Sequence, residues 1–173
     1  MKPLRNDGEV CAPPGSPSSA AFLLAQLGAH ASSRFAERLT ELNLTPAHSG
    51  VLRILGSTPA ITQQALAETL GMVPSRLVAL VDELEARGLV DRREDANDRR
   101  KYALHLTDEG RSILERIGRV AREHQRVLLS ALSAGEQQQL AAFLQRIADE
   151  QGLPRGVHPG YSRLRIPSGG ETQ

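Results

Sequence analysis

The chain has few aromatic residues, one cysteine and no tryptophan. Aromatic side chains make up 3% of its 173 residues, whereas hydrophobic residues as a whole make up 40%. Because aliphatic side chains must then form the core, the composition favours closely packed helices over an aromatic-rich β-sandwich or barrel. The lone Cys11 excludes an internal disulfide bond and a zinc site built from several cysteines.

Long apolar runs are also missing. No stretch is long and apolar enough to span a bilayer, and the N-terminus lacks an apolar segment followed by a small-residue cleavage site. We therefore expect a cytoplasmic protein with no membrane partner.

The sequence also lacks a large excess of either positive or negative charge. The formal net charge is +1, so the chain lacks the broad positive field of a purely electrostatic DNA binder. Any contact with DNA must then depend on where individual basic residues lie. Nearly all of them are arginines, whose planar donor groups suit phosphates, guanine edges and narrow minor grooves.

Proline, glycine and charged residues are concentrated at both ends of the chain. Residues 1–17 predict a disordered N-terminal tail and residues 152–173 a flexible C-terminal tail, because neither segment has a periodic apolar face. The remaining residues, 18–151, suit one compact domain.

Six helices are predicted inside this domain from residues that can cap a helix and precede apolar positions spaced by three and four. The first helix ends near Asn43, and Gly71 ends the third before a tight turn into the fourth. Ser133 and Glu136 form a capping box for the last helix. The helices are expected to start after these residues: Ser18 or Ser19, Thr45, Thr62, Val73, Thr107 and Ser133.

Two short strands, 89–93 and 101–106, are predicted around a polar tip at 94–98. In the second strand, alternate residues from Tyr102 onward are expected to share one face. The predicted fold class is therefore mainly α with a small β-hairpin wing. A winged helix-turn-helix has the same order of elements: helix, tight turn, helix and hairpin. Its second helix enters the major groove of DNA.

Several separate motifs in the same order carry a resemblance to a known family. They are Leu44-Thr45, Val51-Leu52, Thr62–Ala67, Leu70-Gly71, Val81–Val90, Asp98–Arg100 and Leu106–Gly110. On these motifs the chain resembles the MarR family of bacterial transcription regulators, over about residues 20–150. The resemblance implies a homodimeric repressor that binds a palindromic operator in double-stranded DNA, and neither an enzyme nor a cofactor. It also implies dimerisation helices at about 18–43 and 108–151, flanking a winged helix-turn-helix at about 45–107.

The resemblance further implies which wing residues contact DNA. Asp98 would hold the wing in place through an ion pair, and Arg100 would enter the minor groove, where narrow stretches concentrate negative potential. Phosphate contacts are expected from Arg92, Arg93, Arg99 and Lys101. From Glu85 to Lys101 the chain carries six basic and five acidic residues, so an ordinary solvated hairpin is the structural alternative.

The predicted recognition helix departs from the family pattern. Val73 stands where a small polar cap is common, and Val78 and Ala79 stand where the family often has a polar and then a basic residue. Ser75 and Arg76 remain as candidates for reading base edges, Arg76 through a bidentate contact with guanine. We therefore expect phosphate, wing and shape contacts to supply much of the affinity.

Histidines near the predicted apolar faces are candidates for binding a small-molecule effector. His30 lies beside the apolar face of the first helix and His124 on that of the fifth, and Arg34 and His48 are further candidates. The histidines could equally be satisfied inside a core or a dimer interface. No metal-ligand spacing, carboxylate pair or nucleophile–base arrangement stands out, so neither a metal site nor a catalytic site is expected.

Three interpretations of the function stay open on the sequence. The leading one is a repressor released from its operator by a small aromatic or lipophilic molecule through a population shift, although the protein could instead activate transcription or lack a ligand. The second is a helical protein-interaction adaptor whose winged helix no longer binds DNA, which the apolar recognition helix supports. The third is a redox-sensing regulator acting through Cys11, against which stands its position in a Pro/Gly-rich tail with no feature that lowers a thiol pKa.

Overall fold

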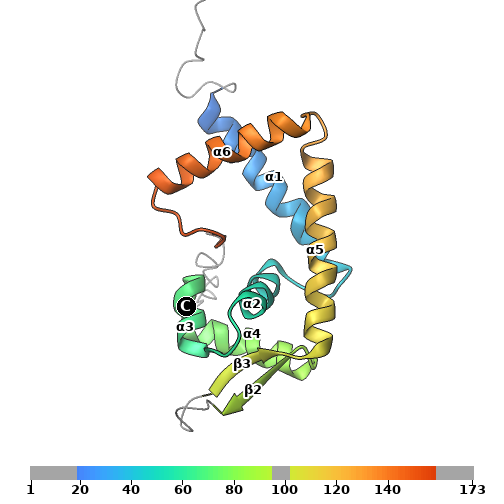
Figure 1. The fold of residues 1–173 in the computed structure, drawn as a ribbon, viewed down its shortest axis with the longest axis vertical. Coiled ribbons are helices and arrows are strands. Elements are labelled where there is room, and N and C mark those ends of the chain that lie inside the picture. Colours follow the sequence, from blue (N-terminus) through green and yellow to red (C-terminus); the bar gives the residue numbers. More distant parts are fainter. Residues whose placement is uncertain (1–18, 95–101, 159–173) are drawn as a thin grey trace, which may run out of the picture.

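The computed structural model describes residues 19–94 and 102–158, which form six helices and three strands (Figure 1). The helices are α1 (Ala20–Thr40), α2 (Pro46–Ser57), α3 (Gln63–Leu70), α4 (Pro74–Ala86), α5 (Asp108–Leu128) and α6 (Ala134–Glu150). The strands are β1 (Ile61–Thr62), β2 (Val90–Glu94) and β3 (Tyr102–Leu106). The predicted fold class, mainly α with a small β wing, is confirmed.

The molecule consists of two layers joined by α5. In Figure 1, α2, α3, α4 and the sheet form a lower body, α1 and α6 lie in the upper part of the view, and α5 runs from the sheet to that part. The core lies mainly in the lower body, and α6 has no buried residue. Every element of the lower body except β1 contributes a large side chain that is fully buried, such as Leu52, Leu66, Leu77, Val90 and Leu104.

The predicted helix starts are confirmed. In five helices the N-cap side chain accepts a hydrogen bond from the backbone N–H three residues on: Ser19, Thr45, Thr62, Thr107 and Ser133. Such a bond satisfies one of the amide groups that the first turn of a helix leaves without a partner. α4 differs, because Val73 makes no side-chain cap bond and Pro74 starts the helix with a φ angle that suits the first turn.

The predicted tight turn between α3 and α4 is also present. Gly71 adopts the left-handed conformation, with φ 61°, which glycine reaches without steric cost. The backbone N–H of Met72 donates to the carbonyl of Ala67 at 2.9 Å and closes the end of α3. α3 and α4 therefore form the helix-turn-helix, and α4 occupies the position of the recognition helix.

The sheet contains the predicted hairpin and one strand that the sequence did not reveal. β1 pairs with β3 in antiparallel fashion, Ile61 opposite Leu104, so β3 is the central strand. A two-residue strand has no alternation by which it could be recognised. Tyr102 is 55% exposed although Leu104 and Leu106 on the same strand are buried, because Tyr102 lies toward the outer end of the wing.

The helical layer keeps large apolar side chains on its surface. Phe22 and Leu27 of α1 and Phe143 and Ile147 of α6 are each between 46% and 56% exposed. Large apolar side chains left exposed on a helical layer are typical of a surface that contacts another protein chain. Among the helices that the structure describes, none is both long and apolar enough to cross a membrane.

The segment after α6 returns to the body of the molecule. The guanidinium of Arg53 on α2 donates a hydrogen bond to the carbonyl of Gly156, and the Ser32 hydroxyl lies 3.3 Å from Nε2 of His158. Val157 packs against the core. Residues 152–158, where the sequence predicted the beginning of a flexible tail, thus contact both α1 and α2.

α5 begins in close contact with the connection between α4 and β2. The Thr107 hydroxyl donates to the carbonyl of Gly88 at 2.7 Å, and the Thr107 backbone N–H donates to the carbonyl of Leu89 at 3.2 Å. A Cβ atom at Gly110 would lie 2.0 Å from the carbonyl oxygen of Leu89. The first turn of α5 can therefore approach β2 this closely only because residue 110 is glycine.

We predict that Gly110→Ala destabilises the protein by at least about 2 kcal/mol, since a backbone atom on the Leu89 side would have to move. Gly118→Ala in the middle of α5 is the matched control, because its Cβ would meet only the end of the Arg122 side chain, at 3.4 Å. The control should be neutral or more stable by about 0.5–1 kcal/mol, from helix propensity. Urea unfolding of both variants measures this, and equal effects would contradict the close-approach explanation.

Candidate nucleic-acid interface and adjoining cavity

The recognition helix α4 buries one face and exposes the opposite one. Leu77, Val81 and Leu84 are fully buried, at the spacing of a single helix face. The predicted base contact Ser75 lies exposed in the first turn, and Val78 is 40% exposed one turn later. The first two turns of α4 thus expose one polar side chain, Ser75, whereas Asp82 and Glu83 are exposed farther along the helix. That base contacts are sparse stays a prediction.

Arg76, the second predicted base contact, lies toward the inside of the molecule. Its side chain is half-buried and lines a cavity together with His48 and Glu83. A contact between Arg76 and a base edge stays a prediction, and it would require the side chain to turn outward from this position.

Arg92 connects the wing to the recognition helix. Its guanidinium forms ion pairs with Asp82 and Glu85 of α4, and its side chain is 23% exposed. Two carboxylates surround a single positive charge, so the side chain acts as a structural link between β2 and α4. The phosphate contact predicted for Arg92 stays a prediction.

The other predicted wing residues fall into two groups. Arg93 is exposed and pairs with Asp91 on the same strand, with 2.9 Å between guanidinium and carboxylate. An exposed pair of this kind is weak, so the guanidinium remains accessible to a phosphate. The predicted residues Asp98, Arg99, Arg100 and Lys101 lie outside the described residues, as does Cys11.

His48 joins the start of α2 to α4 through both ring nitrogens. Nδ1 accepts a hydrogen bond from the Thr45 backbone N–H at 3.2 Å, so Nε2 carries the proton and donates it to the Glu83 carboxylate at 2.9 Å. The Thr45 hydroxyl accepts from the His48 backbone N–H and completes a capping box. No local signal reveals the partner Glu83, because 35 residues separate it from His48.

Burial sets the protonation state of His48. The side chain is 8% exposed, and burial lowers its pKa from the ordinary value of 6.5. The hydrogen bond and the charge of Glu83 act in the opposite direction, and the charge of Arg87 lowers the pKa further. The neutral ring is therefore the form that fits between Thr45 and Glu83.

The cavity beside α4 has a volume of about 850 Å³. Its lining is mostly apolar, with Ala31 and Phe35 from α1, Ala47 from α2, Leu80 from α4 and Ala121 from α5. Cavities of this size and character hold drug-sized ligands. A molecule bound here would touch the recognition helix and the helical layer at the same time.

His48 and His124 both belong to this lining. The imidazole of His124 lies 5.6 Å from the ring of Phe35, measured between ring centroids. Burial lowers the pKa of His124, and the nearby cationic groups Arg38, His30 and Arg34 lower it further. The guanidinium groups of Arg34 and Arg38 are therefore close enough to His124 to disfavour its protonated form.

The other two predicted effector residues stand outside the lining. His30 and Arg34 are exposed on α1, and Arg34 pairs with Glu37 at 2.7 Å. Direct contact of either residue with an effector stays a prediction. Within the described ranges no cluster of His, Cys, Asp and Glu side chains has the arrangement of a metal site.

We predict that His48 makes the folded protein sensitive to mild acid. Its folded pKa lies below 6.5, so at pH values near and below 6.5 the unfolded chain binds more protons than the folded protein does. The contribution of His48 to stability is therefore complete above about pH 6.5 and falls as the pH decreases. Thermal unfolding between about pH 7.5 and pH 5.5 should show a smaller loss of Tm in His48→Gln, which keeps a capping-box side chain but does not titrate.

Glu83→Gln should change the acid sensitivity in the other direction. Glu83 raises the pKa of His48, so its removal lowers that pKa further and steepens the loss of Tm below about pH 6.5. Identical pH profiles for wild type, His48→Gln and Glu83→Gln would show that this pair does not control acid stability.

Comparison with known proteins places the fold and the interface in a family. The profile of the MarR family matches residues 42–101, from just after α1 to the residue before β3. A putative transcriptional regulatory protein for the hcr operon, from Thauera aromatica, is 32% identical over 115 residues, which cover 66% of this chain and 69% of that relative.

Solved structures show the same architecture. The transcriptional repressor CouR bound to a 23-mer DNA duplex is 33% identical, with a TM-score of 0.67, over 75% of this chain and 92% of that one. CouR from Rhodococcus jostii RHA1 bound to p-coumaroyl-CoA is 30% identical, with a TM-score of 0.62, over 74% and 90% of the two chains. Apo MarR from E. coli is 26% identical, with a TM-score of 0.66, over 74% and 96%.

The helix-turn-helix, the wing and the flanking helices are thus shared with proteins that are similar to this chain along most of their length. Sequence identity above 30% accompanies that likeness in both the Thauera protein and CouR. The chain belongs to the MarR family, and it is a DNA-binding transcription regulator and not an enzyme.

Proposed function

We propose that the protein is a homodimeric repressor that binds a palindromic operator and leaves it when a small molecule occupies the cavity beside α4. Two recognition helices held by one dimer would enter major grooves about one helical turn apart, with the wings at the flanking minor grooves. The observation that carries the proposal is the set of exposed apolar side chains on α1 and α6, in a chain whose other elements form a winged helix-turn-helix.

The apolar surface supports dimerisation of the helical layer. Phe143 and Ile147 lie four residues apart and therefore on one face of α6, and Phe22 and Leu27 of α1 are exposed in the same layer. Burial of these side chains against a second copy would remove apolar surface from water, which is the main driving force of association. The winged body lies away from that surface (Figure 1) and stays accessible to DNA.

We predict that Phe143→Glu produces a monomer with at least tenfold weaker operator binding, because only a dimer engages both half-sites at once. Gln138→Glu is the matched control, since it adds the same charge at an exposed position of α6 on another side of the helix. Sedimentation gives the oligomeric state, and fluorescence anisotropy gives binding to the DNA that flanks the coding region.

Salt dependence separates this function from a protein-interaction adaptor. Operator affinity of the wild type should fall steeply with increasing salt, because each phosphate contact displaces counterions. A monomeric wild type, or a Phe143→Glu monomer with unchanged operator affinity, would contradict the proposal.

The position of the cavity supports control by a ligand. Its walls include Leu80 and Arg76 of α4 and Ala121 and His124 of α5, so an occupant contacts both the recognition helix and the scaffold that would space the two helices. The relative CouR has been crystallised with a DNA duplex and with p-coumaroyl-CoA. We infer that an aromatic or lipophilic ligand favours a spacing of the recognition helices that no longer fits the operator.

We predict that Ala31→Trp blocks the response to ligand without loss of operator binding. Ala31 is half-buried on α1 and faces the cavity, so an indole would occupy the space of the ligand while α4 and the wing keep their sequence. Operator release is measured with p-coumaroyl-CoA, p-coumarate and benzoate as probes. Ala29→Trp, exposed on α1 and outside the lining, is the control. The effector proposal would be contradicted if Ala31→Trp left the operator at the ligand concentration that releases the wild type. It would also be contradicted if no probe released the wild type from the operator.

A further inference from the structure

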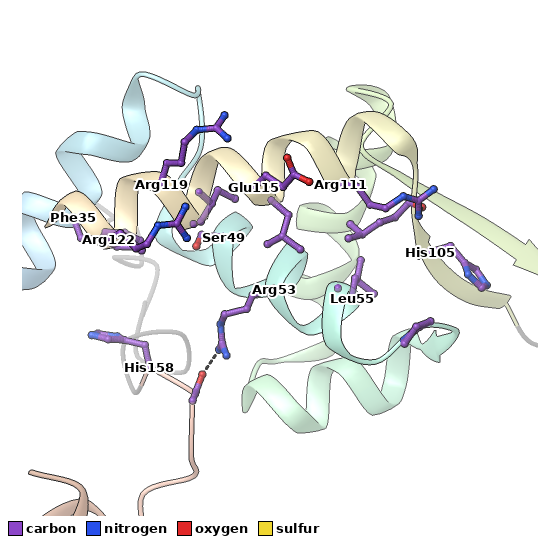
Figure 2. A pocket seen from close by; sticks show the side chains of 18 of the residues that line it. Phe35, Ser49, Arg53, Leu55, His105, Arg111, Glu115, Arg119, Arg122 and His158 are labelled. Atoms are coloured by element: carbon purple, nitrogen blue, oxygen red, sulfur yellow. Dashed lines mark hydrogen bonds between the residues drawn. The ribbon is translucent and has the colours of Figure 1, made fainter. Parts of the chain in front are cut away.

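A second cavity lies on the other side of Phe35. Its volume is about 1120 Å³, and its walls come from α2, α5, β3 and the segment after α6 (Figure 2). Phe35, Ala121 and His158 line both cavities, so the two spaces adjoin at these residues. We call this second cavity the arginine groove, after the side chains that line it.

The arginine groove has a strong excess of positive charge. Five arginines and two histidines line it, against the single carboxylate of Glu115. This excess is unusual for the chain, whose total net charge is only +1. The arginines are Arg53, Arg93, Arg111, Arg119 and Arg122.

Three of these guanidinium groups have no carboxylate partner among residues 19–94 and 102–158. Arg93 and Arg111 form ion pairs with acidic neighbours on their own segments. Arg53 donates to the carbonyl of Gly156, a neutral acceptor that leaves its charge uncompensated. For Arg119 and Arg122 the described residues provide no ion pair; Figure 2 shows Arg53 extending from α2 toward Gly156, and Arg122 on α5.

The two cavities differ in chemistry. The cavity beside α4 is lined mostly by apolar side chains such as Ala31, Leu80 and Ala121, whereas the arginine groove combines an apolar floor with five guanidinium groups. A simple aromatic acid would fill the first cavity and leave the second unused. A ligand that matches both must carry an apolar group at one end and several negative charges at the other.

We propose that the arginine groove binds the phosphate-bearing part of the effector, whose acyl or aromatic group occupies the cavity beside α4. The chemical class is a thioester of a nucleotide carrier, as in acyl-coenzyme A compounds. Arginine suits this role because its planar donors bind phosphate oxygens in pairs and its charge is permanent. This assignment rests on the proposed function, because it takes the ligand to be the effector. Binding of the ligand can nevertheless be measured without DNA.

The position of the groove favours a small polyanion over the DNA backbone. No residue of the recognition helix α4 lines it, and three of its arginines, 53, 119 and 122, lie on α2 and α5, whereas Arg93 belongs to the wing strand β2. The groove is a concave space between these helices and the segment that contains Gly156. Contacts to duplex DNA are the alternative that the experiment must detect.

The test measures binding of benzoyl-CoA, octanoyl-CoA, benzoate and coenzyme A by calorimetry on the full-length protein without DNA. Wild type should bind the thioesters at least tenfold more tightly than benzoate. The double variant Arg53→Gln/Arg122→Gln should weaken thioester binding by at least tenfold and leave benzoate binding unchanged, since it removes two charge-assisted contacts. Arg146→Gln, exposed on α6 and outside the groove, is the matched control and should bind like wild type.

Three outcomes would overturn the assignment. Thioester binding unaffected by the double variant would place the phosphates elsewhere. Equal affinity of wild type for benzoate and benzoyl-CoA would show that the carrier makes no contact. A large loss of operator affinity in the double variant, with thioester binding intact, would assign the groove to DNA.

The same experiment keeps the two proposals apart. Tight, arginine-dependent thioester binding without release of the operator would contradict control by the ligand and leave the arginine groove assigned. Release from the operator by benzoate alone, with ligand binding unchanged in the double variant, would support the effector mechanism and contradict the assignment of the arginine groove. Circular-dichroism melting of each variant establishes that it is folded before binding is measured.

Discussion

The contact between the first turn of α5 and the carbonyl of Leu89 is the constraint on which the architecture depends. Thr107 is bonded to the carbonyls of Gly88 and Leu89, and Gly110 has no side-chain atom that would hold the helix away. α5 therefore starts from a fixed point on the winged body and continues into the helical layer. Because one continuous helix belongs to both layers, a change in the packing of one layer is transmitted to the position of the other.

Within the winged body, α4 is held by charged links on its acidic residues. Arg92 of the wing pairs with Asp82 and Glu85, and His48 at the start of α2 binds Glu83. These links and the buried leucines fix α4 relative to α2 and β2, while Ser75 and Val78 remain exposed. The cavity beside α4 includes the His48–Glu83 pair in its wall, so a ligand there meets one of the links directly. Membership in a DNA-binding family removes the adaptor interpretation that the apolar face of α4 had left open.

The site could be predicted only in part from sequence. Motifs correctly located the helix-turn-helix and the hairpin, because their signals are local. The DNA contacts expected of Arg92 and Arg76 stay predictions; what sequence position did not reveal is that Arg92 forms two ion pairs with α4 and that Arg76 lines the cavity. The sequence gives the number and positions of the charged residues. It does not show which of them form ion pairs in the folded protein.

By itself the sequence determined the helix starts, the turn at Gly71 and the family, because a cap acts over three residues and an apolar face repeats every three or four. Tertiary structure alone decided that His48 meets Glu83, 35 positions away, and that Arg53 reaches Gly156, 103 positions away. It also decided that arginines from α2 and α5 share one groove. Such contacts arise when helices pack, and no local periodicity encodes which polar side chains then face each other.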